Sequence, residues 1–352
     1  MPKPSLVIDR THLGRRASGI ERITEELFSD EAFRSLPVEG FAASGGGRLA
    51  IAAAQMAQAP LAMMARPSTL WAFSGFPPSP LAVLFRERAV MYVHDMFLIT
   101  RRQDLNRAAR IYMSMPFRLA VERLRYFLVN SATTGDSLAP YVRPDAEIRP
   151  YRPEVRNVFG LVPRRAEETP GTPLVLGAIG TVEPRKNLMA AAAIAAELGR
   201  RTGRPVELHV VGRAGWGEDH RLLAAEPHVT LHGFLPEDEA RAVVARFDAL
   251  ICTSHDEGLG LPLIEAQYAG LQVIAPDKPV FREVLGASGL YIEPADVAGA
   301  AALLEGRFGE AGWRDRAAAA AEHNIARWNA QAREDHAAVV TFLSERLARL
   351  AA

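Results

Sequence analysis

The second half of the sequence alternates short apolar runs with helical segments, and this order restricts the fold more than any other feature. Runs this short and continuous are typical of strands buried on both faces of a sheet. Strands that alternate with helices form a parallel sheet covered by helices, so we expect a doubly wound α/β unit. The predicted strands are Leu174–Ile179, Val206–Val211, Val229–His232, Ala249–Thr253 and Gln272–Ala275, and the predicted helices are Asn187–Arg200, Pro236–Ala245 and Leu263–Leu271.

The first half shows a looser version of the same pattern. A buried strand is predicted at Ser5–Asp9, followed by a loop with Gly14 and Gly19 and a helix over Glu21–Phe28. Strand, glycine loop and helix form the phosphate-binding unit of a doubly wound sheet, although the GxGxxG fingerprint is missing here. Residues 42–65 are expected to be helical, and further strands are predicted at Thr69–Phe73, Ala89–Val93 and Arg125–Val129.

A chain of 352 residues is too long for one ordinary core and long enough for two. Residues 150–172 contain four prolines and mixed charge, a composition that suits a connection between domains. We therefore expect an N-terminal domain of residues 1–165 and a C-terminal domain of residues 170–328, with a cleft between them. The amphipathic helix expected at residues 329–352 would pack back on the first domain.

Charge and composition exclude several classes of protein. The formal net charge is zero, with 41 basic and 41 acidic residues, which argues against nucleic acid as a partner. Residues 1–170 carry +6 and the remainder −6. This asymmetry would suit an anionic acceptor or a lipid surface, and it also arises by chance. The single cysteine excludes a disulfide framework, and no signal peptide or membrane span is evident. We expect a cytoplasmic protein whose membrane contact, if any, is peripheral and through the basic N-terminal domain.

The segment EGLGLPLIE, residues 257–265, places two glutamates eight positions apart across the start of a predicted helix. Gly258 and Gly260 allow a ligand to approach the backbone closely, and the helix start exposes N–H groups that suit phosphate. Glu257 and Glu265 could each hold a pair of sugar hydroxyls. A carboxylate near a helix start is also a common cap, so a structural role stays open.

The segment GTVEPRKN, residues 180–187, begins at Gly180 where a predicted strand ends and a helix starts. Ligands of open parallel sheets bind at this edge. Arg185 can bond a diphosphate with two hydrogen bonds, and Lys186 adds a point charge. The alternative is a solvated surface pair.

Two further residues are weaker candidates. His94, in VHDMF, follows a predicted strand and could bond a sugar hydroxyl or orient an acceptor, although a lone histidine there is more often structural. Phe234 follows another strand and either packs near a nucleotide base or is an ordinary buried aromatic. No Asp-x-Asp, GxxxxGK[ST], GxSxG, HExxH or CxxC pattern occurs, so we expect no metal ion and no cofactor.

Taken in order, GTVEPRKN, HGFL, TSHDEGLGLPLIEA and FREVLG resemble the retaining GT-B glycosyltransferases of family 4. The resemblance covers about residues 174–300, and DRTHLGRRASGIERI and YVHDMF extend it loosely to the first half. One departure is Leu259, which stands where the family often has a bulky aromatic. The resemblance implies the GT-B fold, in which two Rossmann-like domains face each other across a cleft.

The resemblance also implies roles for single residues. Glu265 would bind the ribose of a nucleoside-diphosphate sugar, and Glu257 would hold hydroxyls of the transferred hexose. Arg185 and Lys186 would bind the diphosphate and stabilise it as the leaving group. The remaining donor or acceptor contacts would come from Gly19, His94, Gly180, Phe234, Leu259 and Gly260.

The function implied is retaining, metal-independent transfer of a hexose to a saccharide or lipid-linked acceptor in surface-polysaccharide synthesis. Because the VHD sequence resembles mannosyl-transferring members, GDP-mannose is the first candidate for the donor, with UDP-hexoses open. A non-catalytic sugar-nucleotide-binding subunit is one alternative. A different enzyme on the same scaffold, such as an epimerase or a phosphorylase, is the other.

Overall fold

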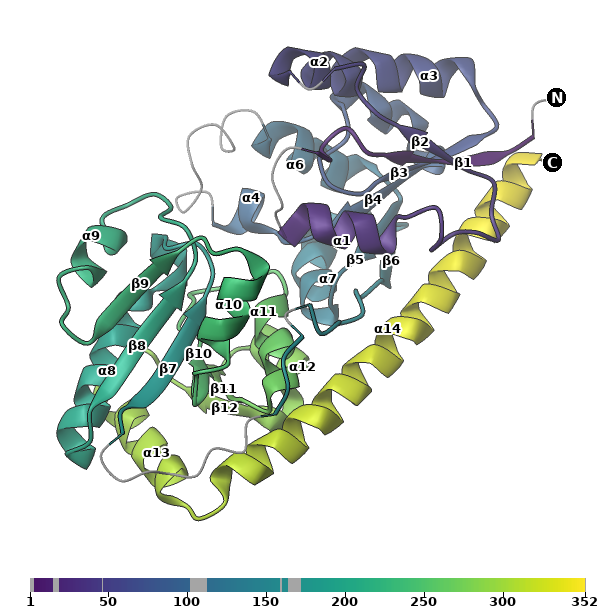
Figure 1. Ribbon diagram of the computed structural model, residues 1–352. Helices are drawn as coiled ribbons and strands as arrows, with labels where there is room; N and C mark the ends of the chain where they lie inside the picture. Colours follow the sequence, from purple (N-terminus) through teal and green to yellow (C-terminus); the bar gives the residue numbers. More distant parts are fainter. Residues whose placement is uncertain are drawn as a thin grey trace. The chain divides into compact units, whose positions relative to one another are not determined.

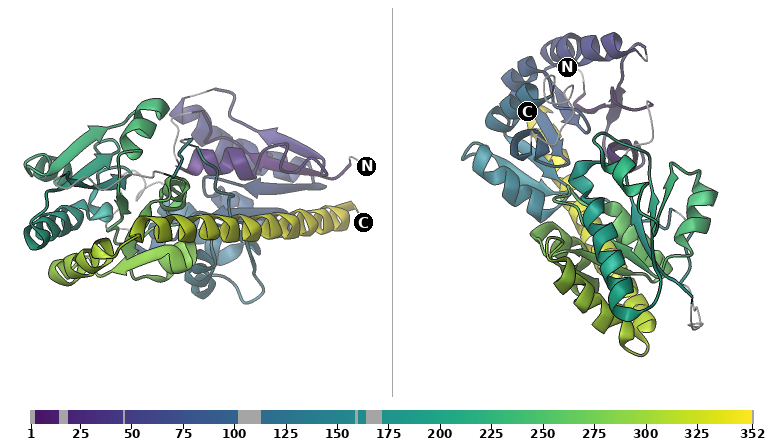
Figure 2. Two further views of the ribbon diagram at one scale, coloured as in Figure 1. Left: turned by 60° about the horizontal axis from the view of Figure 1, so that its bottom comes forward. Right: turned by 90° about the vertical axis from the view of Figure 1, so that its left-hand side faces the viewer.

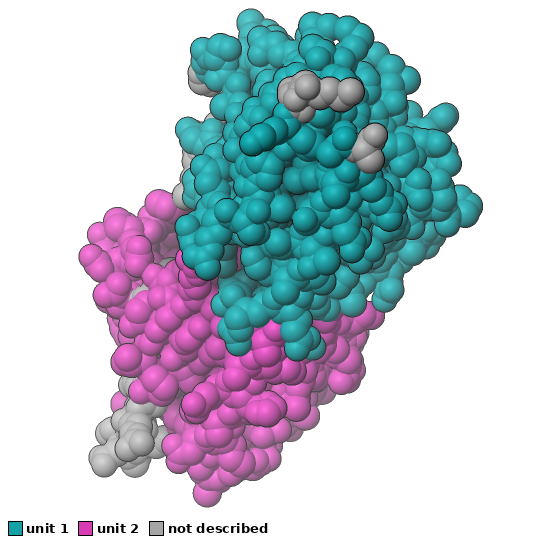
Figure 3. Space-filling model, turned by 90° about the vertical axis from the view of Figure 1, so that its right-hand side faces the viewer, with its two compact units in different colours: residues 1–154, 331–352 teal, residues 155–330 magenta. Residues whose placement is uncertain are grey.

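The structure, a computed structural model, describes residues 3–14, 19–45, 47–101, 113–158, 160–163 and 172–351. The chain divides into two compact units (Figure 3). The first comprises Met1–Glu154 and Gln331–Ala352, and the second comprises Val155–Ala330. Within the described residues each unit has one six-stranded sheet, and every strand pair in it is parallel (Figure 1). The predicted fold class, two Rossmann-like α/β units, is confirmed.

The sheet of the first unit has the order β2-β1-β3-β4-β5-β6. The direction of the strand order reverses between β1 and β3, which makes this pair the switch point of the sheet. Its strands are β1 (Ser5–Asp9), β2 (Val38–Phe41), β3 (Thr69–Phe73), β4 (Ala89–Val93), β5 (Tyr126–Val129) and β6 (Glu147–Pro150).

One face of this sheet buries alternate side chains such as Val7, Trp71 and Met91 against the helices. This period of two is what a pleated strand requires when one face meets a helix layer. The helical segments are α1 (Gly19–Leu27), α2 (Arg48–Ala53), the π-helical turn η1 (Ala54–Gln58), α3 (Ala59–Ala65), η2 (Pro80–Arg88), α4 (Phe97–Thr100), α6 (Ser114–Arg123), α7 (Ala132–Leu138) and η4 (Ala139–Tyr141).

The sheet of the second unit has the order β12-β11-β10-β7-β8-β9. Taken in chain order this is 6-5-4-1-2-3, the order of a dinucleotide-binding sheet, and its switch point lies between β7 and β10. Its strands are β7 (Leu174–Ile179), β8 (Val206–Val211), β9 (Val229–Gly233), β10 (Ala249–Ile251), β11 (Gln272–Pro276) and β12 (Gly289–Ile292).

The alanine-rich helix α8 (Leu188–Thr202) packs with α13 (Val297–Gly309) over one face of this sheet. Its small side chains, Ala191, Ala192 and Ala195, are fully or nearly fully buried, so the helix lies close to the strands. The other helical segments are η5 (Pro184–Lys186), α9 (Asp219–Leu223), α10 (Glu237–Val244), α11 (Leu261–Glu265), η6 (Ala266–Ala269), α12 (Pro279–Leu285) and η7 (Gly286–Ser288).

The C-terminal helix α14 (Trp313–Ala351) is continuous over 39 residues (Figure 2). Its residues up to Ala330 belong to the second unit and those from Gln331 to the first. In the first unit, Asp335 of α14 forms an ion pair of 2.6 Å with Arg152, and both side chains are largely buried. Tyr151 stacks on His336 and donates its hydroxyl to the Leu27 carbonyl at 2.6 Å. These contacts fix residues 331–351 to the first sheet. None of the helices in the described part of the chain is long and apolar enough to cross a membrane.

Candidate functional site

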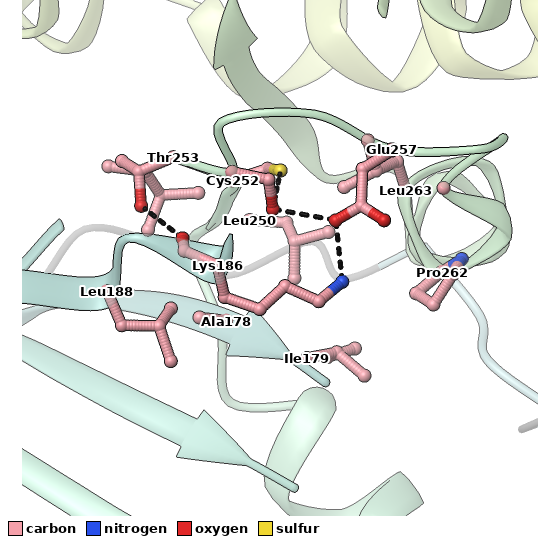
Figure 4. Close-up of a pocket in the computed structure, with 13 residues that line it drawn as sticks. Ala178, Ile179, Lys186, Leu188, Leu250, Cys252, Thr253, Glu257, Pro262 and Leu263 are labelled. Atoms are coloured by element: carbon pink, nitrogen blue, oxygen red, sulfur yellow. Dashed lines mark hydrogen bonds and ion pairs between the residues drawn. The ribbon is translucent and has the colours of Figure 1, made fainter. Parts of the chain in front are cut away.

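Arg185, Lys186 and Glu257 meet at the switch point of the second sheet, between the segments that follow β7 and β10. Lys186 Nζ lies 2.6 Å from Glu257 Oε1, and Arg185 Nη1 lies 2.9 Å from Glu257 Oε2 (Figure 4 shows the lysine contact). The three side chains are 9% to 19% exposed. The sequence predicted these residues for one site, and the structure brings them together.

Backbone geometry directs the two cations to this point. Gly180 has a φ of 140°, and a β-carbon there would lie 3.3 Å from Lys186 Cε, so the glycine leaves room for the lysine chain. Arg185 and Lys186 lie on the 3-10 turn η5, and Asn187 follows with a left-handed φ of 50°. The two cations therefore lie directly before α8, close to the predicted helix start at Asn187. The left-handed residue separates their turn from α8.

The planar guanidinium group of Arg185 contacts three partners. Besides Glu257, Nη1 donates to the backbone carbonyl of Asp256 at 2.9 Å, and Nη2 contacts Glu183 Oε1 at 2.8 Å. Two cations thus face two carboxylates. Because the side chains are mostly buried, these ion pairs are screened less than surface pairs are.

Two hydroxyl groups that the sequence analysis did not single out complete the cluster. Ser254 Oγ donates to Glu257 Oε1 at 2.6 Å. Thr253 Oγ1 contacts the backbone carbonyls of Lys186 and Asn187 at 3.2 and 2.8 Å, which ties the two segments together (Figure 4 shows the Lys186 contact). The predicted strand extended through Thr253, whereas β10 ends at Ile251, so both residues lie in the loop. The sequence signal for Ser254 was its position three residues before Glu257, which indicates that its hydroxyl could reach the carboxylate.

The cluster keeps Glu257 ionised. Burial alone would raise the pKa of this carboxyl, but Lys186, Arg185 and the hydrogen bonds outweigh burial and lower the pKa to about 2. Conversely, burial lowers the pKa of Arg185, and Glu257 and Glu183 more than compensate, so its pKa lies above the ordinary value. Glu257 therefore acts as a carboxylate at any physiological pH and does not serve as a general acid.

This pKa predicts a specific dependence of stability on pH. The carboxyl titrates near 4.5 when unperturbed and at about 2 in the folded chain. Because the folded-state pKa is lower than the unperturbed one, the ionised Glu257 contributes its full stabilisation of the folded state above pH 4.5. This contribution is lost as the pH falls toward 2. We expect the group to account for about 3 kcal/mol of the free energy of unfolding over that range, measured by urea titration. A Glu257→Gln variant should lack this part of the change in unfolding free energy with pH. An equal change with pH in both proteins would contradict the ion-paired geometry.

A cavity of about 30 Å³ lies beside the cluster, and its lining includes Lys186, Glu257 and apolar side chains such as Leu250 and Leu263 (Figure 4). This volume is on the scale of a water molecule, not of a sugar ring.

The EGLGLPLIE segment forms a shorter helix than predicted. Gly260, with a φ of 79°, precedes α11, which ends at Glu265 and continues only as a 3-10 turn. Pro262 lies in the first turn, as expected. Leu259 as a whole is 3% exposed, and its contact with a ligand stays a prediction. Glu265 is also 3% exposed and does not line the cavity, and its role as ribose ligand stays a prediction.

The remaining predicted residues lie elsewhere. Phe234 follows β9 and is 74% exposed, so the alternative that it is an ordinary buried aromatic is wrong. His94 and Gly19 belong to the first unit, where His94 directly follows β4 and Gly19 opens α1. Residues 15–18 of the preceding glycine loop lie outside the described residues. The predicted roles of His94 and Gly19 at the sugar donor are not tested by these positions.

Comparison with protein families finds the model "Glycosyl transferases group 1" over residues 173–306. Serotype-specific mannosyltransferase WbdA of Escherichia coli is 39% identical over 129 residues, which is 34% of this chain and 16% of WbdA. O-antigen chain mannosyltransferase B of Escherichia coli is 30% identical over 146 residues, 40% of this chain and 38% of that protein. The chain thus spans less than half the length of these curated relatives.

Solved structures resemble the chain over nearly its whole length. HepE of Anabaena, crystallised with UDP and glucose, has a TM-score of 0.64 at 16% identity and covers 95% of this chain and 100% of its own. WaaG, a glycosyltransferase involved in lipopolysaccharide biosynthesis, has a TM-score of 0.65 at 15% identity, and the match covers 96% of this chain and 99% of WaaG. Sucrose-phosphate synthase of Thermosynechococcus elongatus has a TM-score of 0.72 at 15% identity, and the match covers 97% of this chain and 100% of the synthase. At such identities the likeness establishes the fold, which is GT-B, and residues 173–306 of this fold match the model of the group 1 glycosyl transferases.

Proposed function

We propose that this protein is a retaining hexosyltransferase that moves a sugar from a nucleoside diphosphate to a saccharide or lipid-linked acceptor in surface-polysaccharide synthesis. The observation that carries the proposal is the cluster of Arg185, Lys186 and Glu257 at the switch point of a group 1 domain. Fixed cations at this place suit a leaving diphosphate, whose charge grows as the bond to the sugar breaks.

The proposed reaction uses the cluster as follows. The bond between C1 of the donor sugar and the diphosphate oxygen breaks, and the acceptor oxygen forms the new bond to C1 on the same face. The acceptor's hydroxyl proton passes to the departing phosphate. Arg185 and Lys186 exchange their carboxylate partners for diphosphate oxygens. This exchange releases Glu257 to accept hydrogen bonds from hydroxyls of the hexose, as the family resemblance implies.

Retention by this front-face route is supported by the state of Glu257. Its carboxylate is held by two cations and by Ser254, all of which reduce its strength as a nucleophile toward C1. A covalent glycosyl–enzyme intermediate on this residue is therefore disfavoured. The same two cations would neutralise the diphosphate without a metal ion, and no cofactor is needed.

GDP-mannose is the first candidate for the donor, because WbdA and O-antigen chain mannosyltransferase B are named as mannosyltransferases. UDP-hexoses are the second candidate, since HepE was crystallised with UDP-glucose. The exposed Phe234 suits contact with either base. We further propose a cytoplasmic location with peripheral membrane contact, supported only by the +6 charge of residues 1–170.

A product assay tests the proposal. The chain is incubated with GDP-mannose or UDP-glucose, with and without a saccharide acceptor, and the anomeric configuration of the product is measured by NMR. We expect an α-linked product from an α-linked donor, at a rate that EDTA does not change. An inverted product would refute retention, and activity lost in EDTA and restored by Mg²⁺ would refute metal independence. Binding without consumption of the donor would identify a non-catalytic subunit, and conversion of the donor alone would identify an epimerase.

A further inference from the structure

The loop that carries Glu257 is held from both neighbouring strands of the second sheet. It follows β10, which lies between β7 and β11. On the β7 side, the Arg185 carbonyl oxygen accepts the His255 N–H at 2.9 Å. On the β11 side, Lys278, two residues beyond the end of that strand, donates from Nζ to the His255 carbonyl oxygen. Only the backbone of one residue separates the Lys278 ammonium group from the Arg185 carbonyl, so a third cation lies beside the cluster.

Lys278 differs from the cations of the cluster because its charge is not paired. Arg185 and Lys186 lie 2.9 and 2.6 Å from oxygens of Glu257. In the described part of the chain no carboxylate forms an ion pair with Lys278, and its ammonium group bonds only the neutral carbonyl of His255. Two of its three hydrogens are thus left for a ligand. Lys278 therefore needs no exchange of a carboxylate before it binds an anion.

The acids beside this contact have other partners. Asp277, the residue before Lys278, accepts hydrogen bonds from Arg282 on both of its carboxylate oxygens. Asp256, in the loop of the cluster, accepts the Glu257 N–H with Oδ1 at 2.9 Å. Neither acid cancels the charge of Lys278 by direct contact.

The position of Lys278 is open to ligands. The residue is partly exposed, and its contact with His255 lies at the exposed surface. It follows the carboxyl end of β11, at the edge where open parallel sheets bind ligands. The chain has only three lysines among its 41 basic residues, and two of them, Lys186 and Lys278, lie at this edge. An ammonium group suits a phosphate that arrives from solution, because its three donors rotate freely.

We propose that Lys278 is a third cation of the donor site, whose unpaired charge attracts the diphosphate before Arg185 and Lys186 release Glu257. The inference rests on the proposed function, and it adds the residue at which the exchange of partners begins. At physiological ionic strength the Debye length is about 8 Å, so a charge this near to the cluster is only partly screened. Its removal should weaken the binding of a nucleoside diphosphate about tenfold at low salt.

Three substitutions separate the charge of Lys278 from its hydrogen bond. Lys278→Arg keeps both, Lys278→Gln keeps a donor for the His255 carbonyl without the charge, and Lys278→Met keeps neither. Calorimetry on the full-length chain at low salt should give Lys278→Gln and Lys278→Met a Kd for GDP or UDP about tenfold above that of the wild type. Lys278→Arg should stay within about twofold of the wild type, because it keeps the charge.

Salt dependence completes this measurement. At about 1 M salt, where the Debye length is about 3 Å, the difference between Lys278→Met and the wild type should largely disappear. A tenfold loss that persists at this salt concentration would overturn the inference. Wild-type affinity in Lys278→Gln at low salt would also overturn it, because the lysine would then be only a structural tie to the loop.

Arg200→Met is the matched control, because it removes one positive charge from the same unit at the other edge of the sheet. Arg200 lies in the last turn of α8, which runs back from the end of β7 to the start of β8, and its side chain is 71% exposed. This variant should bind GDP and UDP as the wild type does. An equal loss in Arg200→Met and Lys278→Met would show that net charge alone governs binding, and it would overturn the inference.

Chemical labelling gives a test that needs no substitution. Reductive methylation modifies lysine side chains, and mass spectrometry of the peptides resolves Lys3, Lys186 and Lys278 separately. GDP should slow the labelling of Lys278, whereas guanosine, which has no phosphate, should not. Lys3, exposed in the first unit, is the internal reference and should react at one rate throughout. Equal labelling of Lys278 with and without saturating GDP would overturn the inference.

Arg185→Ala distinguishes failure of this inference from failure of the proposed function. If Arg185→Ala weakens the binding of GDP and UDP while Lys278→Met does not, only the role of Lys278 is wrong. If neither variant weakens binding, or the wild type binds neither nucleotide, the proposed diphosphate site is wrong and both conclusions fail.

Discussion

Replacing Glu257 by glutamine should lower kcat/KM for transfer by about 100-fold or more, because the amide neither balances the two cations nor holds the sugar hydroxyls as a carboxylate does. The same change should lower the free energy of unfolding by about 3 kcal/mol, since it leaves two largely buried cations with one carboxylate between them. Steady-state kinetics and urea titration at pH 7 measure the two effects.

A third measurement separates a catalytic role of Glu257 from simple loss of structure. In the resting protein this carboxylate occupies Arg185 and Lys186, so its removal frees them for a diphosphate. Glu257→Gln should therefore bind GDP or UDP at least as tightly as the wild type while turning over far more slowly. Glu218→Gln, which breaks an exposed ion pair with Arg221 in the same unit, is the control and should change neither quantity. Weaker binding together with slower turnover would contradict the proposed exchange of partners.

Replacing Arg185 by alanine should raise the Kd for the nucleoside diphosphate about 100-fold, because two charge-assisted hydrogen bonds to phosphate are lost. The rate of transfer should fall by a larger factor than the affinity for the nucleoside diphosphate does, because the charge on the leaving group is greatest in the transition state. Arg185→Lys should restore little, because an ammonium group cannot reproduce the planar fork that reaches Glu257, Asp256 and Glu183. Isothermal titration calorimetry measures the Kd, and single-turnover kinetics measure the rate of transfer.

The matched control for Arg185 is Arg221→Ala, which removes an arginine of the same unit whose side chain is 74% exposed. It should leave binding and turnover within experimental error. If Arg185→Ala bound GDP and UDP as tightly as this control, the cluster would not be the diphosphate site. The proposed function would then lose its main support.

Most of the fold could be predicted because buried parallel strands carry a strong local signal. The strands Leu174–Ile179 and Val206–Val211 were predicted to the residue. The first is apolar on both faces, and the second has Val206, Leu208 and Val210 on one face. The strands at Val38–Phe41 and Glu147–Pro150 were missed. Both form edges of the first sheet and keep several side chains partly exposed, so their sequences resemble loops.

The proximity of Arg185, Lys186 and Glu257 was predictable because the motifs that contain them follow the carboxyl ends of predicted strands, whereas their roles stay predictions. The detailed geometry of the site was not predictable, because it depends on backbone conformation. The two cations lie on a 3-10 turn that the left-handed Asn187 separates from α8, and asparagine gives only a weak signal for this conformation. The pairing of the cations with Glu257 before any ligand is present was also not foreseen. It requires the loops after β7 and β10 to be adjacent, which strand order decides.

The ion pairs of the cluster join residues that are 71 and 72 positions apart in the chain. An emerging polypeptide therefore carries both cations long before the carboxylate that neutralises them is synthesised, and β10 must insert beside β7 before the three groups meet. If the cluster binds a nucleoside diphosphate as proposed, retention on an immobilised GDP or UDP column would report completed assembly of the second sheet. Such a column would separate native molecules from compact but misregistered ones.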